Sequence, residues 1–381
     1  MPPEAEIYLD NNATTPAIAE VARAVTEALT EGFGNPSSAH ARGDLARRRL
    51  QRARETVAGF LGAEPEQLVF VSSGTEGNNA VLGGVRVSTL ITTVVEHPSV
   101  LSPIAAAAAR GAAVVELGVD HSGLIALSAL EAALRAASRA LVSVQWASGE
   151  TGVVQPIEEI AAICRRHGAL LHVDAAQAVG RLPIDLRRLS INFLTFSGHK
   201  LHAPPGIGVL FVRAPGAMAP WLLGGGQEQG LRSGTENLPG VLGLAAAIEH
   251  RATRFAAALR ALRQLRDALE REVLAAVAGV EVNGGGAPRL GNTSNLRFTG
   301  VDGQALLAAL DRAGIRCSQA SACSSHRPEP SYVLRAMGLS EDEAFASLRF
   351  SVSVLNTEDE IDRAVKAIKA AAAQLRSVLL V

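Results

Sequence analysis

Short apolar runs rich in β-branched residues alternate with longer segments of helical periodicity between about residues 66 and 212. Continuous apolar runs of this kind are typical of strands that are buried on both faces of a parallel sheet. The pattern therefore predicts an α/β fold, with helices on both sides of a mostly parallel sheet and functional groups at the carboxyl ends of its strands. The seven predicted strands are 68–71, 89–95, 113–117, 140–144, 170–173, 193–196 and 209–212.

The pattern changes after Leu238. The residues up to about Val277 are rich in Ala, Leu, Arg and Glu, and they predict one long helix. A last helix is expected to begin at Thr357, because Glu360, three residues later, completes a capping box. Between these helices lie a glycine turn and two short predicted strands, at 284–286, 294–298 and 348–351.

The chain has 381 residues, of which 48% are hydrophobic, which is enough for two domains with separate cores. We expect a large domain over residues 15–250 and a smaller α+β domain made of 1–14 and 251–381. The formal net charge of −1 argues against a general nucleic-acid binder. Apolar stretches are short, and the first thirty residues show no charged segment followed by an apolar run, so neither a membrane span nor a signal peptide is expected.

Two of the predicted strands end in residues that could hold the two ends of one flat cofactor. The strand at 193–196 runs into Ser-Gly-His and then Lys200, and the strand at 170–173 runs into Asp174. Taken alone, Lys200 fits a surface lysine and Asp174 fits a helix cap. Together they match pyridoxal phosphate (PLP) chemistry, which needs a lysine that forms a Schiff base and an acid that keeps the pyridine nitrogen protonated.

Two further features lie at the same predicted edge of the sheet. After the strand at 68–71 comes a turn with Gly74 and Thr75 that opens a helix, an arrangement that can bind phosphate but is common at ordinary helix starts. His97 closes the strand at 89–95 and precedes Pro98. A single histidine is usually structural, but one at this edge could stack on a cofactor ring.

These segments resemble those of the class V aminotransferase group, and specifically the NifS/IscS-type cysteine desulfurases. The resemblance covers essentially the whole chain and implies the PLP-dependent fold type I and a homodimer. The matching segments are 8–16, 34–38, 73–76, 96–98, 152–156, 173–177, 197–200, 232–237, 321–325, 329–338 and 357–362.

The resemblance also implies a reaction. L-Cysteine would be converted to L-alanine through a PLP aldimine, with Lys200 as the Schiff-base lysine and His97 as a general acid or base. Cys323 would be the nucleophile that takes the sulfur as a persulfide and delivers it to an acceptor protein. The cofactor-binding residues implied by the resemblance are Lys200, Asp174, Gln177, His97, Gly74, Thr75, Ser197 and His199, with Thr235 contributed by the second subunit. The implied substrate-binding residues are Arg349, as a carboxylate clamp, and Asn12. No metal site is expected.

The three cysteines differ in their surroundings. Residues 318–330 are small, polar and proline-containing, so Cys323 is expected in a mobile, exposed loop that suits a sulfur carrier. Cys164 lies on the apolar face of a helical pattern, and Cys317 follows Ile315 in a strand-like stretch, so both are expected to be inert. Three cysteines do not form a disulfide framework, and we expect a reducing cytoplasm.

The sequence departs from the family at three places. Ser148-Gly149 replaces two asparagines, one of which usually contacts the phenolic oxygen of the cofactor, so we expect a modest change in cofactor electronics without loss of function. Ser353-Val354 replaces a common Gly-Arg pair. Gln319 and residues 326–328 also differ from the usual small residues near the reactive cysteine.

Several alternatives stay open. A selenocysteine lyase or another class V enzyme would share Lys200 and Asp174, whereas Cys323 favours desulfuration. A non-catalytic sulfur-relay scaffold is supported only by Ser148-Gly149. The sulfur acceptor is not revealed, because iron–sulfur cluster biosynthesis, tRNA thiolation, cofactor biosynthesis and DNA phosphorothioation would all use the same reaction. No direct contact with nucleic acid or membrane is expected.

Overall fold

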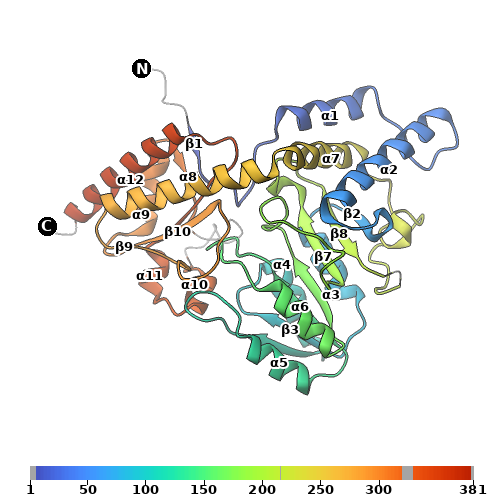
Figure 1. Ribbon diagram of the computed structural model, residues 1–381, viewed down its shortest axis with the longest axis horizontal. Coiled ribbons are helices and arrows are strands. Elements are labelled where there is room, and N and C mark those ends of the chain that lie inside the picture. Colours follow the sequence, from blue (N-terminus) through green and yellow to red (C-terminus); the bar gives the residue numbers. More distant parts are fainter. Residues whose placement is uncertain (1–5, 215, 320–328, 379–381) are drawn as a thin grey trace.

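The computed structural model describes residues 6–214, 216–319 and 329–378. Figure 1 shows two lobes, one around a large sheet and one that combines the N-terminal strand with the C-terminal third of the chain. The large sheet has seven strands in the order β2-β8-β7-β6-β5-β3-β4, and all neighbours are parallel except where β8 meets β7 and β2. The predicted mostly parallel seven-stranded sheet is therefore confirmed. Its strands are β2 (Leu68–Val71), β3 (Thr89–Thr93), β4 (Ala113–Leu117), β5 (Ala140–Gln145), β6 (Leu170–Asp174), β7 (Phe193–Ser197) and β8 (Gly208–Val212).

Alternate residues of these strands enter two different cores. In β8, Val209 and Phe211 pack with one cluster, whereas Leu210 and Val212 pack with the other. This is the period of two that a strand buried on both faces must show. The first core is shared with α1 (Ala19–Thr30), α2 (Ala41–Leu61), α5 (Leu127–Ala136), α6 (Ile157–Arg166) and α7 (Leu238–Thr253). The second is shared with α3 (Gly74–Gly84) and α4 (Pro98–Ala109).

The second lobe has its own hydrophobic core, in which Ile7 and Leu9 pack with side chains from residues 262–372. An antiparallel sheet in the order β12-β10-β9 forms its centre, and β1 pairs in parallel with β11. Its elements are β1 (Ile7–Tyr8), α8 (Phe255–Ala276), β9 (Val280–Val282), β10 (Thr293–Phe298), α9 (Gly303–Arg312), β11 (Ile315–Arg316), α10 (Tyr332–Ala336), α11 (Glu341–Phe345), β12 (Ser347–Ser351) and α12 (Glu358–Val378).

The prediction of a single long helix from Leu238 to Val277 is wrong. The structure has two helices, α7 and α8, which meet at Arg254, where the backbone leaves the helical region (φ −125°, ψ 13°). The reason is tertiary, because α7 packs against α1 and α2 of the large lobe while α8 packs against α12, β9 and β10 of the small one.

Two local predictions can be checked at element ends. The capping box is confirmed, since the Thr357 backbone N–H donates to Glu360 Oε2 (3.0 Å) and the Glu360 N–H donates to Thr357 Oγ1 (3.2 Å). The strand predicted to reach residue 95 ends at Thr93, and a turn leads from there to His97. Within the described part of the chain, no helix is long and apolar enough to cross a membrane.

Candidate active site

A cavity of about 260 Å³ opens at the carboxyl ends of β5, β6 and β7 and at the N-terminus of α3. This is the edge at which a parallel sheet is expected to place its functional groups. The structure brings together here most of the site residues predicted from the sequence. They are Asn12, Gly74, Thr75, His97, Asp174, Gln177, Ser197, His199, Lys200 and Arg349.

Lys200 enters the cavity directly after β7, through one 3₁₀ turn, η2 (Gly198–Lys200). Gly198 makes this tight exit possible, because a Cβ there would lie 2.9 Å from Ile207 Cγ2. The Lys200 ammonium donates to the carbonyl oxygens of Asn12 (2.5 Å) and Ala13 (2.7 Å). Its amine is thus held at the cavity wall by the segment that follows β1.

Asp174 ends β6 and is 6% exposed. Its Oδ1 accepts from the Ala176 N–H (2.9 Å) and its Oδ2 accepts from Asn78 Nδ2 (2.8 Å). Asn78 is itself fixed, since it donates to Ser99 Oγ (2.8 Å) and accepts from the Thr195 hydroxyl. These two donors therefore fix the orientation of the carboxylate at the end of β6.

The N-terminus of α3 forms the end of the cavity that suits a phosphate. Ser73 caps the helix by accepting from the Glu76 N–H (3.2 Å), and the Gly74 N–H donates to Ser197 Oγ (2.7 Å). A Cβ at position 74 would lie 3.1 Å from Ser197 Oγ, so glycine permits this close approach. The helix dipole and the Thr75 side chain then face the same end of the cavity, where an anion is stabilised.

Two histidines of the cavity are uncharged at neutral pH. Burial lowers the pKa of His97, and its Nδ1 accepts from the Ser99 N–H (3.1 Å) at the start of α4. Because Nδ1 is an acceptor there, the proton of the neutral ring sits on Nε2. Burial, together with the charges of Lys200 and Arg181, lowers the pKa of His199 to about 4.

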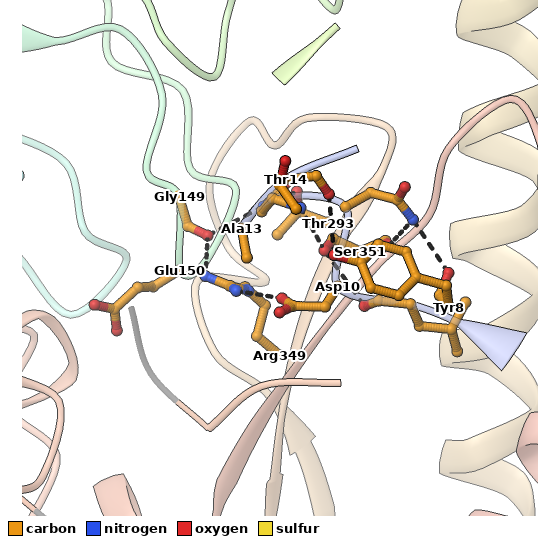
Figure 2. A network of polar contacts seen from close by, with 12 residues as sticks. Tyr8, Asp10, Ala13, Thr14, Gly149, Glu150, Thr293, Arg349 and Ser351 are labelled. Atoms are coloured by element: carbon orange, nitrogen blue, oxygen red, sulfur yellow. Dashed lines mark hydrogen bonds and ion pairs between the residues drawn. The ribbon is translucent and has the colours of Figure 1, made fainter. Parts of the chain in front are cut away.

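Arg349 lies on β12 and is 3% exposed, and Figure 2 shows its guanidinium between two partners from different lobes. Nη2 pairs with Asp10 Oδ1 (2.5 Å), and Nη1 donates to the Gly149 carbonyl oxygen (3.1 Å). Nε has no hydrogen-bond partner among the residues that the structure describes. Each Nη nitrogen carries a second N–H group, so the guanidinium retains donor capacity at the cavity that it lines.

The Ser148-Gly149 departure has a local explanation. Ser148 Oγ accepts from the backbone N–H groups of Glu150 and Thr151 (3.2 Å each), so it holds its own loop and keeps only its hydroxyl proton for another partner. A Cβ at position 149 would come within 3.1 Å of Gln177 Nε2. Glycine at position 149 thus leaves room for the Gln177 side chain in this conformation.

Two predicted site residues do not belong to this cavity as described. Thr235 lies in a separate cavity of about 210 Å³, which Ser72 and Arg232 also line. Cys323 lies outside the described residues. The residues on either side of its segment flank the active-site cavity, because the Ser318 N–H donates to the Arg349 carbonyl (3.1 Å) and Tyr332 lines the wall.

The other two cysteines have no access to this chemistry. Cys164 is buried in α6, and burial raises the pKa of its thiol to about 12. Burial and the nearby Asp10 carboxylate raise the pKa of Cys317 to about 12 as well. Both thiols therefore stay protonated at neutral pH. They are poor nucleophiles, because the reactive form of cysteine is the thiolate.

Two residues that organise the site were missed from the sequence. Asn78 follows Gly74 by four positions on α3, so helical spacing could have placed it on the face that points toward β6. Asp10 stands within the segment 8–16 but carries no local signal of its role, because its partner Arg349 is far away in the sequence.

The sequence matches the aminotransferase class-V family over residues 7–364, and the chain belongs to this family. It is 44% identical to a cysteine desulfurase of Trichormus azollae over 377 residues, which cover 98% of this chain and 94% of the relative. It is 43% identical to the cysteine desulfurase NifS of Azotobacter vinelandii over 380 residues, with the same coverage.

Solved structures agree. A NifS-like protein superposes with a TM-score of 0.89 at 34% identity, covering 97% of this chain and 100% of that one. DndA from Streptomyces lividans superposes with a TM-score of 0.77 at 35% identity, covering 90% of this chain and 98% of that one. The fold is the PLP-dependent fold type I, as the sequence predicted.

Members of this family are PLP-dependent, and the cavity fits this cofactor. Lys200 and Asp174 end the neighbouring strands β7 and β6, so one can reach the aldehyde carbon and the other the pyridine nitrogen. The N-terminus of α3 provides the phosphate end, and His97 and Gln177 line the space between.

Proposed function

We propose that the chain is a PLP-dependent cysteine desulfurase, which converts L-cysteine to L-alanine and passes the sulfur to an acceptor protein. One observation carries the proposal. Lys200, Asp174 and Arg349 line a single cavity, so a lysine, an acid for the pyridine nitrogen and a carboxylate-binding cation are available to one small amino acid. The full-length similarity to cysteine desulfurases supports cysteine as that amino acid.

When bound, PLP supplies the electron sink for the charge that develops at the substrate Cα. Lys200 holds the cofactor and then moves the Cα proton on its ε-amine. Asp174, fixed by Asn78 and the Ala176 N–H, would keep the proton on the pyridine nitrogen. Arg349 binds the substrate carboxylate through its remaining donors, which orients the amino acid in the cavity.

Cys323 is the nucleophile of the proposal. Its thiolate attacks the substrate sulfur, so an S–S bond forms on Cys323 while the Cβ–S bond of the substrate breaks, and the three-carbon remainder leaves as alanine after proton return. His97, neutral with its proton on Nε2, is the group placed to protonate or deprotonate near the substrate thiol.

The proposal includes an assembly and a location. The active form is a homodimer in which Thr235 of one subunit reaches the phosphate end of its partner's cavity, and Thr235 lies away from its own cavity. The large domain spans 15–250, and the smaller one, with the Cys323 segment, comprises 1–14 and 251–381, a division supported by the separate small-lobe core. A reducing cytoplasm keeps the working thiol free.

The test is an activity assay on the PLP-loaded homodimer. Alanine and total sulfide plus persulfide are measured from L-cysteine, with L-selenocysteine as a parallel substrate. We expect alanine and sulfur in equal amounts, and no turnover by Lys200→Ala. Preference for selenocysteine by orders of magnitude would instead identify a selenocysteine lyase, and no turnover of either substrate by the loaded wild type would contradict the proposal.

A further inference from the structure

A second cavity, of about 420 Å³, lies between the two lobes at the break between α7 and α8. Its volume is within the range of about 300 to 1,000 Å³ that is typical of small-molecule sites. Its buried side chains are Ile18, Leu201, His202, Ala247, Arg251 and Leu265. The exposed residues at its rim are Arg254, Ala257, Ala261 and Leu355.

The charge of this interlobe cavity has one sign. Arg251 and Arg254 line it, and no aspartate or glutamate does so among the described residues. One of its two histidines, His202, donates a hydrogen bond from Nδ1 to the Pro16 carbonyl oxygen (2.8 Å). Its ring stays neutral because burial lowers its pKa to about 4. The cavity therefore favours an anion over a zwitterion or a cation.

The surroundings of Arg251 indicate that the interlobe cavity binds an anionic ligand. The residue is 7% exposed, yet its guanidinium forms no ion pair with a carboxylate within the described ranges 6–214, 216–319 and 329–378. A buried N–H group of a charged side chain that is left unpaired costs free energy, and a bound carboxylate would remove that cost with a charge-assisted bond. The rest of the wall is mostly alanine, leucine, isoleucine and valine, which suits an aliphatic chain.

We propose that the interlobe cavity binds a small aliphatic monocarboxylate, with its carboxylate on Arg251 and its chain against the apolar wall formed by α8 and residues 354–355. Amino acids, including cysteine and alanine, are disfavoured because their ammonium group would face two arginines without a carboxylate partner. The site is thus distinct in its ligand from the active-site cavity.

Its position connects both catalytic lobes. Leu201 and His202 directly follow Lys200, whereas Val354 lies three residues beyond the end of β12, which carries Arg349. Val354 is also one of the positions at which this sequence departs from the common Gly-Arg pair. A ligand here contacts both lobes, so its binding stabilises their relative placement and raises the unfolding temperature.

The experiment is calorimetric titration of the PLP-loaded protein with sodium hexanoate, hexylamine hydrochloride and sodium sulfate. We expect hexanoate to bind once per chain, with millimolar or tighter affinity and at least tenfold more strongly than the other two probes. Arg251→Gln and Ala258→Leu, which fills the cavity, should each weaken hexanoate binding at least tenfold. Arg260→Gln, an exposed change on α8 that lies outside the cavity, is the control and should have no effect.

Hexanoate could also reach Arg349, so the titration is repeated on Arg349→Gln protein, in which one site per chain should remain. Because Arg251→Gln could disturb folding, Ala258→Leu tests the site independently by filling the cavity while Arg251 is retained. Absence of hexanoate binding, equal binding of sulfate, or binding that survives both Arg251→Gln and Ala258→Leu would each overturn the proposal.

Discussion

Asn78 Nδ2 lies 2.8 Å from Asp174 Oδ2 and donates a hydrogen bond that fixes this carboxylate at the end of β6. Asn78 is fully buried, and the same amide is held by Ser99 and Thr195. The acid assigned to the pyridine nitrogen is thus positioned by Asn78, which also lines the active-site cavity.

We expect Asn78→Ala to weaken PLP binding about ten- to a hundredfold, because a hydrogen bond to a charged group contributes roughly 1.5 to 3 kcal/mol. The dissociation constant is measured by titration of the visible cofactor absorbance. Asn79→Ala is the matched control, since Asn79 bonds only locally to the Thr75 carbonyl. Equal PLP affinities of the two variants would show that Asn78 does not position Asp174.

The Asp10–Arg349 ion pair gives a prediction on stability. Asp10→Ala leaves the nearly buried Arg349 guanidinium without its carboxylate partner. We therefore expect the free energy of unfolding to fall by about 2 kcal/mol or more. Asp44→Ala removes a carboxylate whose pair with Arg47 is exposed, and it should cost at most about 1 kcal/mol. Chemical denaturation measures both, and an Asp10→Ala protein as stable as Asp44→Ala would refute the structural role of the pair.

The composite site is tested by mixing two inactive variants. Lys200 and Arg349 line the same chain's cavity, whereas Thr235 is expected from the other subunit. In a mixed dimer of Lys200→Ala and Thr235→Arg subunits, one site has its own Lys200 and an intact partner threonine. We expect activity to reappear after subunit exchange. If exchange is demonstrated and no activity returns, Thr235 does not act across the dimer.

Buried histidines predict a loss of stability in acid. Burial lowers the pKa of His172 from 6.5 to about 4. Between these pH values His172 is protonated in the unfolded chain but not in the folded chain. Its contribution to the free energy of unfolding is therefore fully present above pH 6.5 and is lost as the pH falls toward 4, by at most about 3 kcal/mol. His172→Asn should flatten the dependence of the unfolding temperature on pH, whereas the exposed His121→Asn should not. Identical slopes in wild type and His172→Asn would contradict this assignment.

The sequence predicted the parts of the fold that depend on local pattern. The seven strands were recognisable because each is a short run of mainly apolar or β-branched residues, including the partly exposed edge strand β4. Lys200 and Asp174 could be placed at one edge because both directly follow such strands. The break at Arg254 was not predictable, since no glycine or proline marks it and its cause is packing against different lobes. Likewise, the pairing of Asp10 with Arg349 arises only when the N-terminal segment folds back onto β12.

A chemical role for Cys323 and a structural role for Cys164 lead to opposite expectations for turnover and stability when each cysteine is replaced by serine. Cys323→Ser should retain folding and cofactor absorbance, while alanine production should fall by orders of magnitude because a serine hydroxyl is a far poorer nucleophile toward sulfur. Cys164→Ser places a hydroxyl in the core of α6, so it should lower stability and leave turnover near normal. Near-normal turnover of Cys323→Ser would exclude Cys323 as the sulfur carrier.

The most direct test of the account is mass spectrometry of the PLP-loaded wild type after incubation with L-cysteine in the absence of reductant. We expect one added sulfur atom on the peptide that contains Cys323, formed together with alanine and absent in Lys200→Ala. Added sulfur found only on Cys164 or Cys317, or alanine formation with no added sulfur on any cysteine, would contradict it.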